Sequence, residues 1–398
     1  MKNVGIYIFG LGQSFHKEEV LKYAERLKNE LLFSCKGSSF ELKSEIINYA
    51  TDNTAKVVRI VQNKGASVSD IVYTFYEFEY HELLTKRFNN QNILLKNMIL
   101  FCLVLKKLPQ LVRRLFVHDQ FNRPYLTFYA FFILVLVSLA VLLLIPATID
   151  MVNQFQATRT ILNFFENLTG SELYTVIKKI YKWTIPLITI LLLTVPESKN
   201  IITSVATEFA CADRYLNDGI QSQIILGNLD LLVEYIAEHE PDSKIHFHCY
   251  SFGSLIAMDF LFPLGSIPSA NTRLLSDVLI TIGNPYEFIN SYYGKYYLNR
   301  NLIMEQKIKW INIYSIADAL SSTFRNDATR GEALFGIKES SLKPVNINYE
   351  ISTDKSQNFF NFITMDGIRM HRLYWDTECN GQSCMRLLYH YLEEQKMI

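Results

Sequence analysis

The sequence predicts an α/β fold, with a mostly parallel sheet flanked by helices and interrupted by a membrane-spanning helical hairpin. Val4–Phe9 is a short apolar run that ends in a glycine turn and leads into a helical pattern. Lys244–Tyr250 alternates apolar and polar positions, as a strand does, and an apolar helix start follows it. Tyr125–Ile149 contains no charged residue across 25 positions. The first two observations predict strand–helix units, and the third predicts the interruption.

The composition argues against several classes of function. The chain of 398 residues can hold one large domain or two smaller ones. Lys plus Arg and Asp plus Glu balance at 39 each, so no bulk charge favours a nucleic-acid partner. The six cysteines are scattered, which favours free thiols; no metal or cofactor is predicted. The apolar run at the N-terminus is too short for a secretory signal.

Residues 1–92 read as the first part of a divided α/β domain. The helical pattern after the glycine turn covers Phe15–Cys35. Three β-leaning runs follow, separated by turn residues, and predict a small meander or a pair of strands beside the core. These runs are Phe40–Tyr49, Lys56–Gln62 and Asp70–Phe78.

Residues 93–200 read as a membrane insertion. At about 1.5 Å per residue, a helix over Tyr125–Ile149 exceeds a bilayer core of about 30 Å, which predicts a transmembrane helix. Ile180–Pro196, with Lys182 snorkelling, is a shorter second span. Ile93–Leu105 is interrupted by Lys96 and predicts an amphipathic helix at the membrane interface. The lipid bilayer is therefore a predicted partner.

The two predicted spans form a hairpin, which returns the chain to the side on which it began. The cluster Arg113, Arg114 and Arg123 precedes the first span. Basic residues favour the cytoplasmic side, so an integral membrane protein with its α/β domain on the cytoplasmic side is expected. Lys178 and Lys179 in the far loop weaken this orientation.

Residues 201–398 read as the second part of the divided α/β domain. Ile224–Ala237 has helical spacing and leads into the strand at Lys244. Two further strands are predicted at Val278–Ile282 and Lys307–Ser315, and a polar-faced helix at Tyr389–Glu394 ends the chain.

Ser251 stands at the tip of the tight turn between the strand and the following helix. A serine there is held out of the sheet, with backbone N–H groups of the new helix directed toward it, which suits a nucleophile. Cys249 and Gly253 flank it as the small residues of the turn. The alternative is a structural turn without a catalytic role, because a short S-x-G-S sequence is common by chance.

An acid and a base follow Ser251 in the order that serine hydrolases require. Asp318 comes directly after the strand Lys307–Ser315, and His371 lies in a loop before the last helix. Asp318 could instead cap a helix, and Asp327 is a rival acid. His390 is the other histidine after Asp318, but it lies within the terminal helical pattern.

Two histidines on the strand before Ser251 have a plainer interpretation. His246 and His248 project from the same face of that strand. They are expected to be covered by a helix rather than to bind metal, because no third ligand is evident.

Together the strand–turn–serine, the T-I-G-N-P strand end and W-I-N-I-Y-S-I-A-D resemble lipase-like members of the α/β-hydrolase superfamily. The resemblance covers about Met1–Gln13 and Ile224–Ile398. It departs from the family where Cys249 replaces a glycine and Phe9 replaces a histidine. It implies Ser251 as nucleophile, His371 as base and Asp318 as its orienting acid. It also implies oxyanion donors at Leu11 and Phe252, with turn residues Gly10, Gly12, Cys249 and Gly253.

The resemblance implies a membrane-anchored serine hydrolase, lipase-, esterase- or phospholipase-like, that cleaves an acyl ester through a covalent acyl-enzyme. A lipid or another apolar ester is the expected substrate, because the anchor holds the site at a bilayer. The alternative is a catalytically silent hydrolase fold used for binding or signalling. The oligomeric state and the acyl chain stay open.

Overall fold

The computed structural model describes residues 2–11, 19–35, 37–63, 69–116, 127, 130–135, 137–141, 198–327, 329–350, 371, 373–376, 378–380 and 383–398. The chain divides into two compact units. The first comprises residues 1–82, 119–126 and 218–398, and the second comprises residues 83–118 and 127–217.

The first unit is built on one eight-stranded sheet, in the order β2-β3-β4-β1-β5-β6-β7-β8. Among the described strands, β3 alone runs antiparallel to its neighbours, and the other pairings are parallel. The strands are β1 (Lys2–Ile8), β2 (Ser39–Ala50), β3 (Asn53–Asn63), β4 (Ser69–Glu77), β5 (Ser243–Tyr250), β6 (Ser276–Ile282), β7 (Lys309–Tyr314) and β8 (Val345–Asn348). The fold is therefore α/β, with a mixed and mostly parallel sheet.

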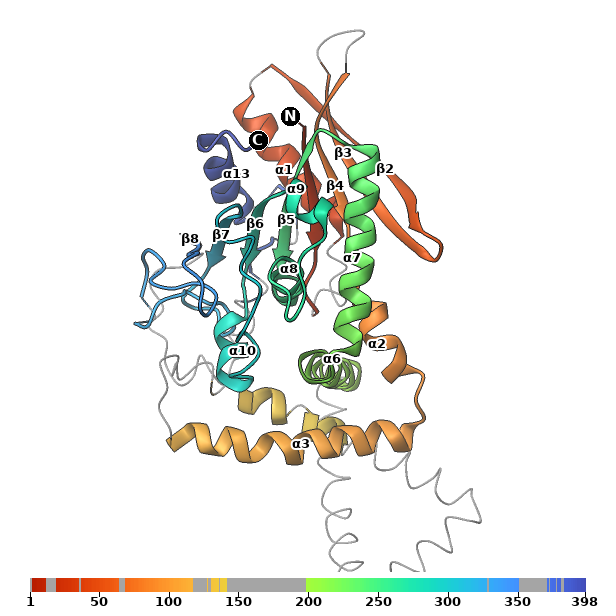
Figure 1. Ribbon diagram of the computed structural model, residues 1–398, viewed down its shortest axis with the longest axis vertical. Coiled ribbons are helices and arrows are strands. Elements are labelled where there is room, and N and C mark those ends of the chain that lie inside the picture. Colours follow the sequence, from red (N-terminus) through yellow and green to blue (C-terminus); the bar gives the residue numbers. More distant parts are fainter. Residues whose placement is uncertain are drawn as a thin grey trace, which may run out of the picture. The chain divides into compact units, whose positions relative to one another are not determined.

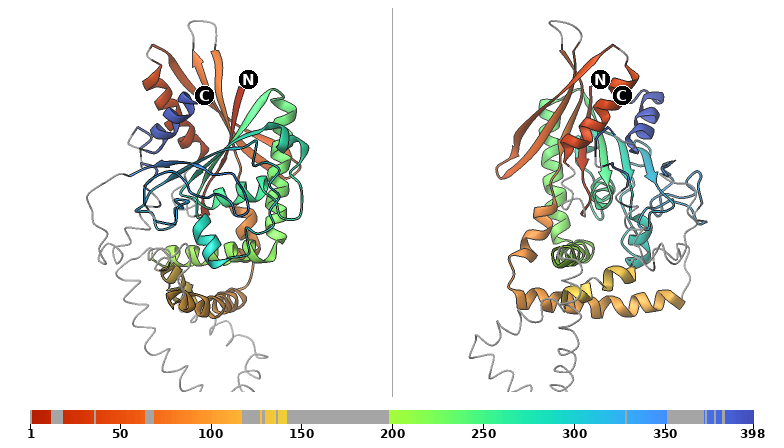
Figure 2. Two further views of the ribbon diagram at one scale, coloured as in Figure 1. Left: turned by 60° about the vertical axis from the view of Figure 1, so that its left-hand side comes forward. Right: turned by 180° about the vertical axis from the view of Figure 1, so that it is seen from behind.

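Helices cover both faces of this sheet (Figure 1, Figure 2). One face carries α1 (Val20–Ser34) and α13 (Met385–Glu394); the other carries α7 (Ile220–His239), α8 (Phe252–Leu261) and α9 (Ala270–Leu275). A further short helix, α10 (Tyr286–Tyr292), follows β6. The side chain of Glu77, at the end of β4, accepts a hydrogen bond from Val20 N at 3.2 Å and so caps the start of α1.

Strand β1 forms the centre of the sheet, between β4 and β5. Its residues from Val4 to Ile8, apart from the glycine, have apolar side chains that are almost fully buried. Gly5 leaves room for an aromatic neighbour, because a Cβ there would lie 2.6 Å from the ring of Phe75. At the other end of the chain, Met397 O accepts a hydrogen bond from Asn3 Nδ2 at 2.6 Å, which holds the C-terminal residues beside β1.

Most of the predicted elements of the first unit are present. The three β-leaning runs form a meander, β2 to β4, that continues the main sheet. The helix expected over Phe15–Cys35 begins at Val20; residues 12–18 lie outside the described part of the chain. Strand β8 was not predicted, because its four residues carry little apolar signal.

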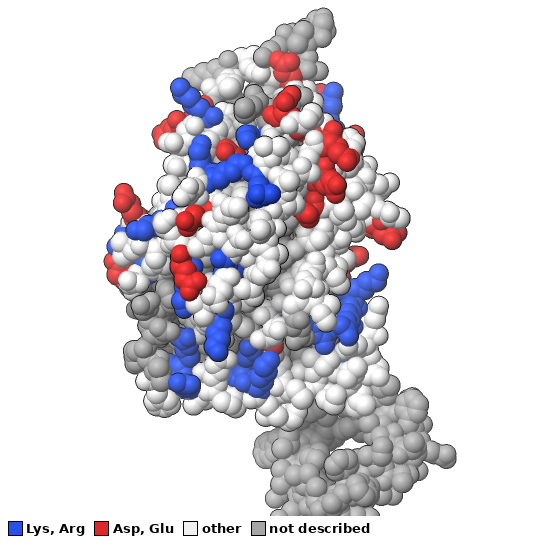
Figure 3. Space-filling view, in the orientation of Figure 1, with Lys and Arg blue, Asp and Glu red and all other residues white. Residues whose placement is uncertain are grey.

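The second unit contains α2 from Leu83 onward (the whole helix is His81–Asn89), α3 (Ile93–Phe116) and most of α6 (Ser198–Asp218). Helix α3 extends the amphipathic segment predicted at Ile93–Leu105 by three turns. Lys107 on α3 makes an ion pair with Asp213 on α6, with Nζ and Oδ1 2.7 Å apart. Lys and Arg side chains gather over α2 and α3 (Figure 3).

The predicted transmembrane spans fall largely on residues that the structure does not describe. Ile180–Pro196 lies wholly outside the described residues, and Tyr125–Ile149 is described only at 127, 130–135 and 137–141. In the part of the chain that is described, no helix has the length and apolar character needed to cross a membrane.

His246 and His248 lie in a buried polar cluster beneath α1. The hydroxyl of Tyr73 is 2.9 Å from His246 Nδ1 and 2.8 Å from His248 Nε2. Tyr23 of α1 bonds the remaining nitrogen of His248 at 2.7 Å. Burial lowers the pKa of His246 to about 4 and lowers that of His248 well below its usual value. Both rings are therefore neutral near pH 7. The Tyr73 hydroxyl lies between them and links them by hydrogen bonds.

This cluster predicts acid sensitivity of the fold. Between about pH 6.5 and pH 4, an unfolded chain protonates His246 while the folded chain keeps it neutral, so the free energy of unfolding falls as pH falls. Full loss amounts to about 3 kcal/mol for a shift of this size. Urea unfolding at a series of pH values measures it.

The matched comparison is His246→Gln, which removes the titrating group. The difference in pH dependence between wild type and variant gives the contribution of His246 alone. Other groups change stability in the opposite direction, such as Glu77, because burial raises its pKa to about 7. A variant with the same pH slope as the wild type would refute this account.

Candidate active site

Ser251 occupies a strained turn between β5 and α8. Its backbone has φ 50° and ψ −120°, a conformation that a residue with a side chain rarely adopts. Strain of this kind costs about 1–3 kcal/mol and must be held by the surrounding structure. Ser251 N donates to Ile282 O of β6 at 2.8 Å, and Ser254 N donates to Ser251 O at 2.9 Å. The turn is thus fixed on both sides, and its serine leads directly into a helix.

The end of β1 packs directly against this turn. A Cβ at Gly253 would lie 2.2 Å from Ile8 O, and one at Gly10 would lie 2.8 Å from Ser251 Cβ. Both distances are shorter than real Cβ contacts. Glycine is therefore required at these two positions, because any side chain would push β1 away from the turn.

Cys249 takes the position that the resemblance reserves for a glycine. Its side chain is buried, and its residue pairs with Ile8 of β1 and Thr281 of β6. Ser251 keeps its positive φ beside it, so the cysteine is compatible with the strained turn. All six cysteines of the chain are free thiols, and burial raises the pKa of Cys249.

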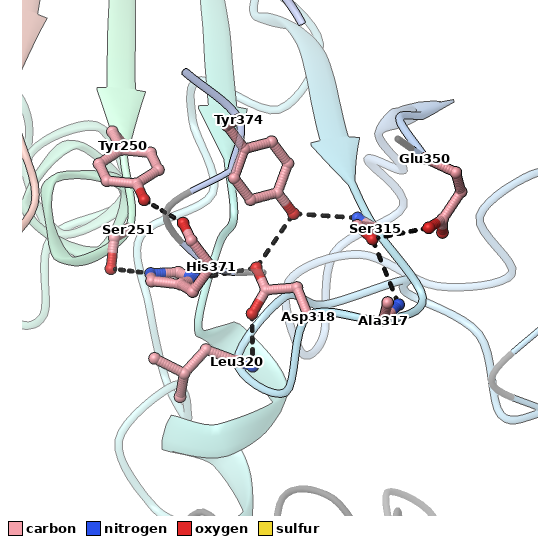
Figure 4. Close-up of polar contacts among 9 residues, drawn as sticks. All are labelled: Tyr250, Ser251, Ser315, Ala317, Asp318, Leu320, Glu350, His371 and Tyr374. Carbon is pink, nitrogen blue, oxygen red and sulfur yellow. Dashed lines mark hydrogen bonds and ion pairs between the residues drawn. The ribbon is translucent and has the colours of Figure 1, made fainter. Parts of the chain in front are cut away.

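His371 lies beside Ser251 and links it to Asp318 (Figure 4). His371 Nε2 is 2.7 Å from Ser251 Oγ, and His371 Nδ1 is 2.7 Å from Asp318 Oδ2. An ionised carboxylate only accepts hydrogen bonds, so Nδ1 carries the proton and Nε2 presents its lone pair to the serine hydroxyl. The side chain of Asp318 is fully buried and that of His371 is 13 % exposed.

The imidazole ring of His371 fits into a space shaped by its neighbours. Gly283, at the end of β6, has φ 59°, and a Cβ there would lie 3.0 Å from His371 Cε1. The ring of Tyr250 stacks on the imidazole with centroids 5.4 Å apart, and its hydroxyl donates to His371 O. The glycine leaves room for the ring, and the tyrosine holds the ring and its backbone.

Asp318 is held by three donors. Oδ2 accepts from His371 and from the Tyr374 hydroxyl at 3.0 Å, while Oδ1 accepts from Leu320 N at 2.9 Å. Ser315 N donates to the Tyr374 oxygen at 2.9 Å, so the tyrosine's own proton is directed at the carboxylate. Burial, and then the charge of Asp318, raise the pKa of Tyr374 well above its usual value, which keeps that proton in place.

The loop that carries Asp318 is fixed by Glu350, which lies just beyond β8. Its carboxylate accepts from Ser315 Oγ at 3.0 Å and from Ile316 N at 2.7 Å. Ala317 N then donates to Ser315 Oγ at 3.2 Å. The acid is therefore positioned from the edge of the sheet as well as from the strand before it.

The rival residues lie in other environments. Asp327, whose side chain is 46 % exposed, accepts two hydrogen bonds of 2.9 and 2.7 Å from Arg325, which lower the pKa of its carboxyl. His390 on α13 is 49 % exposed and 3.9 Å from Glu393. The backbone bond from Leu320 to Asp318 is the cap-like contact expected as an alternative. Here it coexists with the bond to His371.

Each predicted oxyanion residue is next in sequence to a residue of the turn or of its contact. Phe252 follows Ser251 and begins α8, and Leu11 follows Gly10, which lies against Ser251 beyond the end of β1. The rings of Phe9 and Phe252 both stack on Tyr80, with centroids 5.3 and 6.0 Å away, and the Tyr80 hydroxyl donates to Phe9 O at 2.9 Å. Gly12 lies outside the described residues.

Several residues of the site were not predicted in these roles. Nothing in the spacing of Tyr374 from His371 distinguishes a hydrogen-bond donor from a residue that packs or lines a pocket. Gly283 belongs to the T-I-G-N-P strand end, which is the sequence feature that points to it. Glu350 and Ser315 have no sequence signal for their contact, because they meet only through the pairing of β7 and β8.

The chain was compared with protein-family models, curated proteins and solved structures, and no match was found in any of the three. The functional interpretation therefore depends on the geometry of this site.

The close approach of β1 to the turn predicts the effect of a single methyl group. Gly253→Ala would force Ile8 away, and overpacking of this kind lowers the free energy of unfolding by about 1–3 kcal/mol. Gly227→Ala on α7 is the matched control, because its Cβ would meet nothing within 4 Å. The control is expected to stabilise by about 0.5–1 kcal/mol. Urea unfolding of both variants tests this, and equal effects would contradict it.

Proposed function

We propose that this protein is a serine hydrolase that cleaves an acyl ester through a covalent acyl-enzyme. One observation carries the proposal: the chain of contacts from Ser251 Oγ to His371 to Asp318, each 2.7 Å long. A nucleophile, a base and an orienting acid in this arrangement are what acyl transfer requires. The strained backbone at Ser251 supports it further, because such strain is concentrated at functional sites.

In the proposed reaction, Ser251 Oγ attacks the ester carbonyl while His371 Nε2 takes its proton. The tetrahedral intermediate collapses when His371 returns that proton to the leaving alkoxide, which departs as an alcohol and leaves the acyl group on Ser251. Water, deprotonated by the same nitrogen, then attacks the acyl-enzyme. His371 returns this proton to Ser251 Oγ as the bond to the acyl group breaks, which releases the acid and restores the serine. Asp318 stabilises the imidazolium that forms at each step.

Charge on the carbonyl oxygen is proposed to be met by the backbone N–H groups of Phe252 and Leu11. This assignment is supported by Phe252 directly following Ser251 at the start of α8, and by the close approach to Ser251 of Gly10, the residue before Leu11. One donor of this kind is worth about 3–4 kcal/mol of transition-state stabilisation. Because backbone donors do not depend on side-chain type, Phe9 in place of a histidine is compatible with the role.

We propose further that the enzyme is anchored in a membrane and acts on a lipid or another apolar ester there. The support is the absence of charge over Tyr125–Ile149 and the apolar length of Ile180–Pro196, in which Lys182 is the one charged residue. A catalytic part on the cytoplasmic side is favoured by the basic residues before the first span.

A fluorophosphonate probe tests the nucleophile. Wild type is expected to be labelled covalently, and Ser251→Ala to lose the labelling completely, because the phosphorus is attacked only by an activated hydroxyl. Ser254→Ala is the matched control: Ser254 lies in the same S-x-G-S sequence, is buried and donates to Cys249 O at 3.3 Å. Gel fluorescence of the three proteins measures the outcome.

Labelling retained in Ser251→Ala would show a different nucleophile. A folded wild type that takes no label would favour the alternative function, a silent scaffold used for binding or signalling.

The acid is tested by comparing two aspartates of the same region. Asp318→Asn is expected to lower kcat for a soluble p-nitrophenyl ester by about 10⁴-fold, because an amide favours the wrong tautomer of His371. Asp327→Asn is expected to leave kcat nearly unchanged, since Asp327 pairs with Arg325. Equal losses in the two variants would remove Asp318 from the proposed triad.

A further inference from the structure

Helix α3 presents two different faces. The side chains of Leu100, Leu103, Lys107 and Leu111 are buried, and the ion pair of Lys107 with Asp213 fixes this face toward α6. A second row of apolar side chains is between 41 % and 57 % exposed. It comprises Leu94, Met98, Phe101, Leu105, Leu108, Val112 and Leu115. We call these seven residues the α3 stripe.

The α3 stripe is continuous along one side of the helix. Its members are separated alternately by four and three residues, which aligns them over the six turns of a helix about 36 Å long. Scattered exposed apolar residues need no explanation, but a contiguous row of this size marks an interaction surface.

The charges of α3 point to the kind of partner. The helix carries five basic residues and no acidic residue. Two of the basic residues, Lys106 and Arg113, are exposed and lie seven positions apart, so they form a row along one border of the solvent-facing side. The Lys106 side chain is 60 % exposed although its Nζ is 3.8 Å from Asp213. Figure 3 shows Lys and Arg gathered over this region.

A second copy of the helix is a poorer match for this surface. The stripe has the heptad spacing of a coiled coil, but such pairs are matched by opposite charges at the flanking positions. On α3 those positions hold Leu95, Asn97, Cys102, Val104, Pro109 and Leu111. Two all-basic helices would repel each other, and Pro109 interrupts the packing edge.

We propose that the α3 stripe lies in the headgroup region of an anionic lipid bilayer, with Lys106 and Arg113 contacting lipid phosphates. An apolar face bordered by cations is the pattern of a helix that lies in a membrane interface. The inference rests on the membrane-associated function proposed above and assigns its lipid contact to a defined surface.

A site-specific fluorophore on the full chain tests the proposal. The exposed native thiol is removed with Cys102→Ser, and the half-buried ones with Cys35→Ser and Cys379→Ser. Leu105→Cys then carries the dye NBD, and Ile224→Cys on α7 is the matched control. These positions are 54 % and 52 % exposed, but α7 carries Asp230, Glu234 and Glu238 instead of cations.

Phosphatidylcholine vesicles with or without phosphatidylglycerol, each carrying nitroxide-labelled lipid, are then added. The dye at position 105 is expected to shift to the blue and to be quenched, more strongly on anionic vesicles, while the dye at position 224 keeps its aqueous emission. Adding Lys106→Gln and Arg113→Gln is expected to weaken the response to anionic vesicles by roughly 30-fold in lipid concentration.

Four results would overturn the proposal. Aqueous emission at position 105 in the presence of vesicles excludes lipid contact. A blue shift without vesicles that grows with protein concentration identifies a second copy as the occupant, and one independent of concentration identifies another part of the chain. A dye response that is the same on neutral and anionic vesicles, and unchanged by both cation substitutions, excludes contact with anionic headgroups.

Fluorophosphonate labelling of Ser251 in the same samples separates this inference from the proposed function. Quenching at position 105 without labelling of Ser251 would refute the proposed hydrolase but support the lipid contact of the α3 stripe. Labelling of Ser251 without quenching would support the hydrolase and refute the lipid contact.

Discussion

The contact between the end of β1 and the turn at Ser251 is the constraint on which the rest of the site depends. Ile8 and Gly10 lie so close to the turn that neither Gly253 nor Gly10 has room for a side chain. β1 in turn aligns with β5 over its whole length, so the register of the central sheet fixes where the strained serine stands. His371 and Asp318 then approach a serine whose position is already set.

The parts of this arrangement that follow local rules could be predicted from the sequence. Three signals depend only on residues a few positions apart in the chain. They are the alternation before Ser251, the small residues around it, and the position of Asp318 directly after a strand. The order of serine, acid and base added a long-range expectation, and the structure brings Ser251, Asp318 and His371 together. The burial of His246 and His248 under a helix followed from their period of two.

What could not be predicted depends on contacts between distant segments. Tyr374 donates a hydrogen bond to Asp318 from 56 residues further along the chain. Glu350 fixes the Ser315 loop because β7 pairs with β8. Asp318 and Asp327 were hard to separate by sequence because both follow the same strand; burial and the Arg325 pair distinguish them. Helix α6 was missed because its boundary with the preceding apolar segment has no strong start signal, and the predicted spans themselves remain predictions.

The central position of β1 has a consequence for how the chain is synthesised. Ile8 pairs with Cys249, a separation of 249 − 8 = 241 residues. At about 5–20 residues per second, β5 leaves the ribosome roughly 12–48 s after β1. During that interval β1 can pair with β4, but its other edge stays open and is exposed to pairing with other nascent chains. Closing so long a loop costs only about 1.2 kcal/mol more than closing one of about 60 residues. The long interval before β5 is synthesised, rather than the entropy of loop closure, therefore gives the main opportunity for mispairing. A holding chaperone would act at this open edge of β1.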